Sequence, residues 1–224
     1  SSIYFWNSAP GNPPADAPAS IPDMNGTLAN AGYWYGRNND SWTISLDNYY
    51  KMLQQTGNEG IITLNYGYAR YGGSANPVAA AAHLAADWVR YDNGRTKYWE
   101  IGNESNGTWQ AGYRIDPSQN KDGQPLLVTG DLYGRHAKVY IDSLRKAAAE
   151  IGKTIFIGVQ LLEQEPASWA TATDRSWNNG VLQQAGNAAD FFIVHSYYTP
   201  YNTNSTPLEI LATASTVTKK YTIM

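Results

Sequence analysis

Short apolar runs alternate with helical segments along most of this chain, and this alternation limits the folds that it can adopt. The predicted strands are Gly60 to Asn65, Thr96 to Gly102, Thr154 to Leu161 and Asp190 to His195, and the predicted helices are 45–56, 77–91, 133–151, 176–185 and 206–213. Apolar strands separated by helices are typical of a parallel sheet covered by helices. The sequence therefore predicts an α/β protein, either a (β/α)8 barrel or a doubly wound sheet.

The two ends of the chain carry different signals. Residues 3–42 are rich in Gly, Pro, Asn and aromatic residues without a sustained period, which predicts a long loop region. Near the other end, Thr206 and Pro207 are typical of a helix start. Residues 221–224 predict the beginning of one more strand. Because the sequence shows no internal repeat, we expect residues 1–224 to form a single domain.

Composition and charge exclude several classes of function. The formal net charge is -3 and the basic residues are scattered, so we expect no nucleic-acid partner. The chain has no Cys, and its three His residues show no metal-ligand spacing. No apolar run approaches the roughly 20 residues that cross a bilayer, so we expect no membrane partner. We also expect no cofactor, since no predicted strand is followed by the G-x-G-x-x-G of a dinucleotide-binding oxidoreductase.

Polar, acidic and aromatic residues follow each predicted strand, and ligands of parallel α/β proteins bind at the carboxyl ends of the strands. These segments are 65–67, 102–105, 160–165 and 195–198. Glu104 is the carboxylate that follows the second predicted strand directly, and a carboxyl group held there can protonate a leaving oxygen. Taken alone, Glu104 is also compatible with a helix cap or with an ion pair to Arg114.

The segment YWEIGNES, residues 98–105, resembles the fourth strand of clan A glycoside hydrolases. SSIYFWN at the start, DNYYKMLQQTGNEGIITLNYG and DFFIVHSYY are similar, in the same order, to segments of the arabinofuranosidase-type members. The resemblance implies a (β/α)8 barrel and a retaining mechanism with two carboxylates about 5 to 5.5 Å apart. It implies that Glu104 is the acid/base, that Asn103 binds the sugar 2-hydroxyl, and that His195 and Tyr197 line the reacting subsite.

The same resemblance predicts that this chain is a piece of a longer protein. The 224 residues fall short of the roughly 250 of a complete barrel, and the matching segments run from the end of strand two to the start of strand seven, about six of eight units. The nucleophile of the family is a Glu at the end of strand seven. We therefore expect the nucleophile a few residues beyond Met224.

Other carboxylates of the chain are weaker candidates for catalysis by their positions, and we interpret them differently. Glu163 and Glu165 follow the next strand along, and we interpret them as a solvated rim rather than as catalysts. Glu100 shares the parity of Glu104 along the strand, so the two side chains are expected on one face. We interpret Glu100 as a buried, hydrogen-bonded residue that supports the site.

The leading interpretation is a secreted or periplasmic glycoside hydrolase that acts on plant or algal oligo- or polysaccharides. Trp34, Trp109 and Tyr66 are candidates for stacking on sugar rings because they lie in loops on the expected catalytic side. Packing beneath long loops is an equal alternative for each ring. The alternative function is a carbohydrate-binding barrel that keeps the cleft without the chemistry.

Overall fold

The computed structural model describes residues 20–23, 25–30, 46–163, 166–196 and 203–213. The chain divides into two compact units, residues 1–193 and 194–224, and each is described by itself. The prediction of residues 221–224 as a strand lies outside the described residues.

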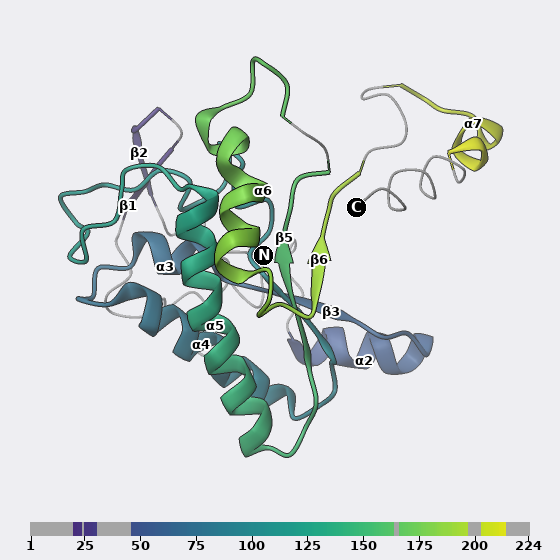
Figure 1. The fold of residues 1–224 in the computed structure, drawn as a ribbon. Helices are drawn as coiled ribbons and strands as arrows, with labels where there is room; N and C mark the ends of the chain where they lie inside the picture. Colours follow the sequence, from purple (N-terminus) through teal and green to yellow (C-terminus); the bar gives the residue numbers. More distant parts are fainter. Residues whose placement is uncertain (1–19, 24, 31–45, 164–165, 197–202, 214–224) are drawn as a thin grey trace. The chain divides into compact units, whose positions relative to one another are not determined.

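The first unit is built on a four-stranded parallel sheet whose strands follow one another in chain order (Figure 1). The strands are β3 (Ile61–Leu64), β4 (Tyr98–Ile101), β5 (Phe156–Gln160) and β6 (Phe191–Ile193). All three pairings are parallel, and Tyr98 lies between Ile61 of β3 and Phe156 of β5 in the register. Consecutive order without a switch point favours the barrel over the doubly wound sheet.

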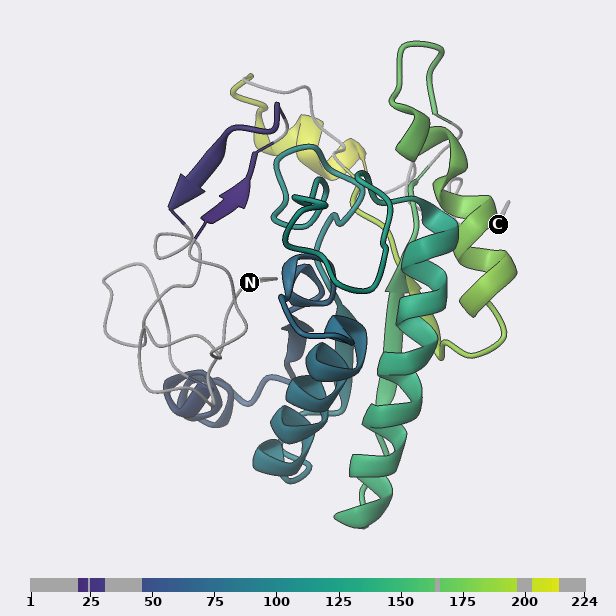
Figure 2. The ribbon, with the colours of Figure 1, turned by 90° about the vertical axis from the view of Figure 1, so that its left-hand side faces the viewer.

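Helices alternate with the strands in sequence, and the longest of them cover one face of the sheet. The helices are α2 (Leu46–Thr56), α3 (Gly67–Tyr71), α4 (Pro77–Asp92), α5 (Gly130–Glu150) and α6 (Ala172–Ala185). Figures 1 and 2 show α4, α5 and α6 side by side on one face of the sheet. Trp99, Ile101, Ile157 and Val159 alternate along β4 and β5 and are fully buried, so they form the core beneath this layer.

The other face of the sheet carries a group of aromatic side chains. Tyr98 and Phe156 are partly exposed, at 37% and 40%, and their rings stack with centroids 5.6 Å apart. Phe191 of β6 meets Tyr98 edge-on at 6.1 Å. Gly158 of β5 leaves room for the side chains of β6, since a Cβ at this position would lie 2.7 Å from Ile193 Cδ1.

Two helices begin earlier than predicted because of their caps. Helix α5 starts at Gly130, where Thr129 Oγ1 accepts a hydrogen bond from Leu132 N at 3.2 Å. Helix α6 starts at Ala172, since Thr171 and Asp174 form a reciprocal capping box. In the second unit, α7 (Pro207–Ala212) begins at the predicted Thr206 cap.

The prediction that residues 3–42 are loop throughout is wrong for the part that the structure describes. β1 (Ser20–Pro22) and β2 (Leu28–Asn30) form an antiparallel pair. Asp23 Oδ1 accepts hydrogen bonds from Asn25 N at 2.8 Å and Thr27 N at 2.9 Å, which closes the turn between them. A further difference is α3, a short helix in the glycine-rich segment that follows β3.

Arg70 of α3 joins this short helix to the long segment between β4 and α5. Its side chain is fully buried, and it donates hydrogen bonds to Gly112 O at 2.9 Å, Gln124 Oε1 at 2.7 Å and Pro125 O at 2.9 Å. Desolvation by burial lowers the pKa of the guanidinium. Arg70 therefore ties down the segment that carries residues 103–127.

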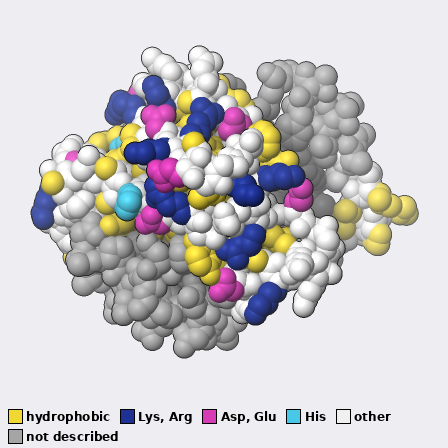
Figure 3. Space-filling model, turned by 90° about the horizontal axis from the view of Figure 1, so that it is seen from below, with side chains coloured by type: hydrophobic (Ala, Val, Ile, Leu, Met, Phe, Trp, Pro, Cys, Tyr) yellow, Lys and Arg dark blue, Asp and Glu magenta, His cyan; other side chains and the backbone are white. Residues whose placement is uncertain are grey.

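The surface at the amino-terminal ends of the strands has mixed charge. Figure 3 shows basic and acidic side chains interspersed over this face. Arg90 Nε lies 2.7 Å from Glu150 Oε2, and Lys97 Nζ lies 3.1 Å from Glu59 Oε1. Among the described residues, no helix is long and apolar enough to cross a membrane.

We predict that Arg70→Met lowers the free energy of unfolding by about 3 kcal/mol, because three side-chain hydrogen bonds are lost at roughly 1 kcal/mol each and the buried Gly112 O is left without its donor. Urea denaturation measures the change. Arg135→Met is the control, since the Arg135–Asp131 ion pair is about half exposed and is expected to contribute less than about 1 kcal/mol. Equal effects of the two substitutions would contradict the role given to Arg70.

Candidate active site

The candidate site lies where β4 gives way to its loop, at the carboxyl edge of the sheet. Glu104 stands three residues after Ile101, the last residue of β4, in a bend. It is far in sequence from the start of α5, whose cap is Thr129, so Glu104 does not cap that helix. The prediction that a strand delivers Glu104 to this edge is confirmed.

The backbone around Glu104 has an unusual conformation. Gly102 has φ +75°, and a Cβ there would overlap Ser105 Oγ and lie 2.9 Å from Tyr66 Cβ. Glu104 itself has φ +46°, a left-handed value that is uncommon outside glycine and that strains a bulkier residue. Its carbonyl oxygen accepts a hydrogen bond from Gly107 N at 2.7 Å, which closes the turn. Strained residues of this kind cluster at functional sites, where the surrounding contacts hold them.

The contacts that hold this turn come from the end of the neighbouring strand. Gln160, the last residue of β5, is 4% exposed, and its Oε1 accepts a hydrogen bond from Ser105 N at 2.7 Å. Its Nε2 donates to Asn106 Oδ1 at 2.7 Å. Asn106 Nδ2 in turn donates to Asp174 Oδ1 of α6 at 2.8 Å. The turn is thus fixed on both sides of Asn106, from β5 and from α6.

Sequence reasoning missed this network. The signal for Gln160 was a polar residue at the end of the apolar run 154–161, and the signal for Asp174 was its spacing from Thr171. Neither signal predicts which loop the side chain of Gln160 or of Asp174 contacts.

Trp109 and Glu104, two of the predicted site residues, are brought together by the turn. The indole Nε1 of Trp109 donates a hydrogen bond to Glu104 Oε2 at 3.2 Å. Trp109 is 63% exposed, so its ring remains open to solvent. Asn103 is partly buried and stands directly before Glu104.

Tyr66 does not fit its predicted role in sugar stacking. It is 2% exposed, and its ring meets Tyr133 edge-on at 4.9 Å, so no face is open to a ligand. Its hydroxyl lies 3.3 Å from His136 Nδ1. Burial raises the pKa of the Tyr66 hydroxyl and lowers the pKa of His136 to about 4. Tyr66 is therefore a core residue beneath the candidate site. It directly precedes α3, so the chain leaves the sheet edge as a helix at this point.

Glu100 fits the interpretation as a buried, hydrogen-bonded residue. It is 6% exposed, and its Oε2 accepts a hydrogen bond from Thr63 Oγ1 at 3.0 Å. Glu163 is partly exposed at the beginning of the loop after β5, and Glu165 lies outside the described residues.

The remaining predicted residues belong to the second unit or lie outside the described residues. His195 is exposed and belongs to the second unit, two residues after the end of β6. Trp34 and Tyr197 lie outside the described residues. Within the described part of the chain, no three His, Asp or Glu side chains gather as a metal site.

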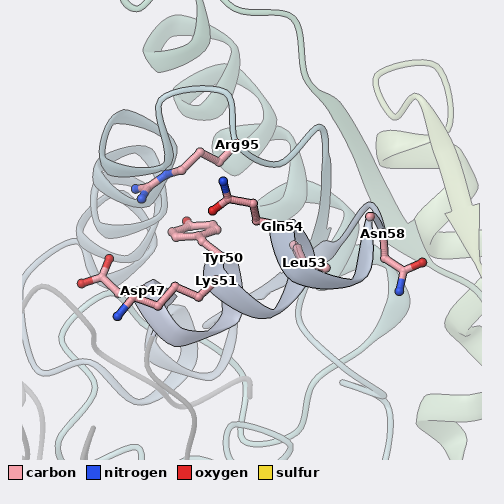
Figure 4. Close-up of a pocket in the computed structure, with 8 residues that line it drawn as sticks. Asp47, Tyr50, Lys51, Leu53, Gln54, Asn58 and Arg95 are labelled. Atoms are coloured by element: carbon pink, nitrogen blue, oxygen red, sulfur yellow. The ribbon is translucent and has the colours of Figure 1, made fainter.

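A hollow of about 720 Å³ lies at the opposite, amino-terminal edge of the sheet (Figure 4). It is lined by Asp47, Lys51 and Gln54 of α2 and by Arg95, whose guanidinium stacks on Tyr50 at 3.8 Å. Because parallel α/β proteins bind ligands at the carboxyl ends of their strands, this hollow is not the candidate active site.

We predict that Gln160→Leu loosens the Glu104 turn, because the buried Ser105 amide loses its acceptor. The expected loss in free energy of unfolding is about 1–3 kcal/mol, and amide hydrogen exchange at Ser105 should accelerate. Gln55→Leu on the exposed side of α2 is the matched control and should change stability by less than about 0.5 kcal/mol. An unchanged exchange rate at Ser105 would argue against the bridge.

We also predict that His136 makes the fold sensitive to mild acid. Its pKa in the folded protein, about 4, lies below the ordinary value of 6.5, so the unfolded chain binds the proton first as pH falls. Stability is therefore lost between about pH 6.5 and pH 4, by about 3 kcal/mol. In His136→Gln this part of the pH dependence should disappear, whereas the exposed His83→Gln should keep it. Identical pH profiles for His136→Gln and the parent would exclude this assignment.

The sequence matches no family model and no curated protein. Among solved structures, the chain is similar to a family 51 α-L-arabinofuranosidase from Bifidobacterium longum, with a TM-score of 0.54 and 19% sequence identity over 98% of this chain and 38% of that one. The catalytic domain of GH30 xylanase C from Talaromyces cellulolyticus aligns with a TM-score of 0.41 and 15% identity, over 90% of this chain and 45% of that one. The chain thus spans less than half the length of either protein. Its fold is that of an incomplete (β/α)8 barrel.

Proposed function

We propose that the intact protein is a retaining glycoside hydrolase in which Glu104 is the general acid and base. The observation that carries the proposal is the placement of Glu104 at the carboxyl end of a barrel strand, in a strained turn held by Gln160, beside an exposed Trp. The sequence resemblance around residues 98–105 and the similarity to the arabinofuranosidase fold both support it.

In the first step, the Glu104 carboxyl donates its proton to the glycosidic oxygen while a second carboxylate attacks the anomeric carbon. The bond from the anomeric carbon to the leaving oxygen breaks, and an ester bond to the second carboxylate forms. In the second step, the Glu104 carboxylate takes a proton from water, which attacks the anomeric carbon and releases the second carboxylate. Each turnover returns Glu104 to its protonated form.

The neighbouring residues have separate parts in this mechanism. The Trp109 indole binds one oxygen of the Glu104 carboxylate and fixes its orientation. Asn103 binds the sugar 2-hydroxyl, a contact that strengthens as the transition state forms. By the resemblance to the arabinofuranosidase-type members, His195 and Tyr197 line the reacting subsite, and the nucleophile is a Glu expected a few residues beyond Met224, at the end of strand seven. Trp34 remains a candidate for sugar stacking.

The substrate class is a plant or algal oligo- or polysaccharide. We propose that the protein acts in the periplasm or outside the cell, where such polysaccharides are encountered. The proposed chemistry needs no cofactor and no metal ion, because both steps use carboxylates and water alone.

We predict that Glu104→Gln in the intact protein lowers kcat on unactivated glycosidic bonds by about 10² to 10⁴-fold, because Gln cannot donate the proton. Hydrolysis of an aryl glycoside with a good leaving group should suffer less, because that leaving group departs without protonation. The matched control is Glu59→Gln, an exposed carboxylate before β3, which should leave turnover unchanged.

The same experiment separates the enzyme from the alternative of a carbohydrate-binding barrel. Turnover of Glu104→Gln within tenfold of the parent would remove Glu104 from the mechanism. Binding of polysaccharide by the parent without any hydrolysis would favour the binding barrel.

A further inference from the structure

Tryptophan exposure differs sharply between the core and the carboxyl edge of the sheet. The structure describes five Trp residues, and Trp88, Trp99 and Trp177 are at most 3% exposed. The other two are Trp109, at 63%, and Trp169, at 88%. Both exposed rings stand on loops that leave the carboxyl ends of neighbouring strands, β4 and β5.

The loop that carries Trp169 is anchored at both ends. At its start, Leu162 N donates to Asn178 Oδ1 at 2.7 Å, and Asn178 Nδ2 donates to Leu162 O at 3.0 Å. At its end, Ala170 N donates to Ala167 O at 2.9 Å, and Ala170 O accepts a hydrogen bond from Arg175. Trp169 thus lies in a closed turn, so its ring is presented by a defined backbone.

The Trp169 loop is also connected to the turn of the candidate acid. Thr171, two residues after Trp169, shares the capping box with Asp174. Asp174 accepts the hydrogen bond from Asn106, two residues after Glu104. Because both loops are fixed to the same carboxylate, their tryptophans are held along one edge of the sheet.

An indole that is mostly exposed leaves a large flat apolar face in contact with water, and covering that face is favourable. Sugar rings present flat patches of C–H groups that can stack on such a face. A surface Trp without a ligand obtains no stabilisation from its exposed ring. Single exposed apolar side chains are ordinary on protein surfaces. The distinguishing observation here is that both exposed indoles lie on adjacent loops at the edge that carries Glu104.

We propose that Trp169 is a stacking platform for a sugar unit of the substrate chain other than the unit whose bond is cleaved. This inference rests on the proposed function and extends it from a single subsite to a binding surface for several consecutive sugar units. Trp109 contacts Glu104 and binds the sugar units at the cleaved bond, and Trp169 binds a more distant unit.

Equilibrium binding to the intact protein tests the proposal independently of turnover. Glu104→Gln serves as the background, and the probes are arabinose, and oligosaccharides of two to six units from arabinan, arabinoxylan and agarose. Trp169→Ala should raise the Kd of the longest bound oligosaccharide about tenfold, the loss expected for one aromatic stacking contact. Trp169→Phe should recover most of the affinity because it keeps a flat ring. The control is Leu182→Ala, which removes an exposed apolar side chain on α6 away from the edge.

The outcomes are distinguishable from those of the proposed function. Equal affinity of the Trp169→Ala protein and its background for every chain length would overturn the inference and leave the hydrolase assignment intact. Retained turnover in Glu104→Gln would remove Glu104 from the proposed mechanism, while the binding measurement would still decide the role of Trp169. Failure of the Glu104→Gln background to bind any probe would overturn the inference, and the turnover of the parent would still decide the hydrolase assignment.

Discussion

The side-chain amide of Gln160 holds the loop after β4 in place, and the proposed function depends on this loop. A parallel sheet brings the carboxyl ends of its strands to one edge, but it does not fix the conformations of the loops that follow them. Here a buried amide at the end of β5 binds the backbone and a side chain of the loop that follows β4. Because both hydrogen-bonding groups of the amide are used, a neighbouring strand helps to maintain the left-handed conformation of Glu104, together with the Gly107–Glu104 hydrogen bond of its own segment.

The rest of the unit supports this edge from two directions. From below, Tyr66 and Tyr133 fill the space beneath the strand ends, and the Tyr133 hydroxyl donates to Ile101 O at 2.6 Å, at the end of β4. From the side, Arg70 binds the loop segment that runs back toward α5. The catalytic candidate thus rests on a rigid scaffold, as an acid that has to meet a glycosidic oxygen requires.

The sequence predicted the alternation of strands and helices well, because apolar runs and caps are local signals. It also located Glu104 at a strand end. The hairpin of residues 20–30 was missed because its strands are only three residues each and depend on the Asp23 turn. Tyr66 was misjudged because its burial results from α3 and from Tyr133, which is distant in sequence. The Gln160 network joins residues more than 50 positions apart, so no local pattern could reveal it.

The proposed function requires the Glu104 carboxyl to face the bond that is cleaved. A crystal structure of the intact Glu104→Gln protein with a bound oligosaccharide would show whether it does. We expect the residue 104 side chain within about 3.2 Å of a glycosidic oxygen, the distance that proton transfer requires. An oligosaccharide bound elsewhere, for example in the hollow lined by Asp47 and Arg95, with residue 104 out of reach, would contradict the proposed function.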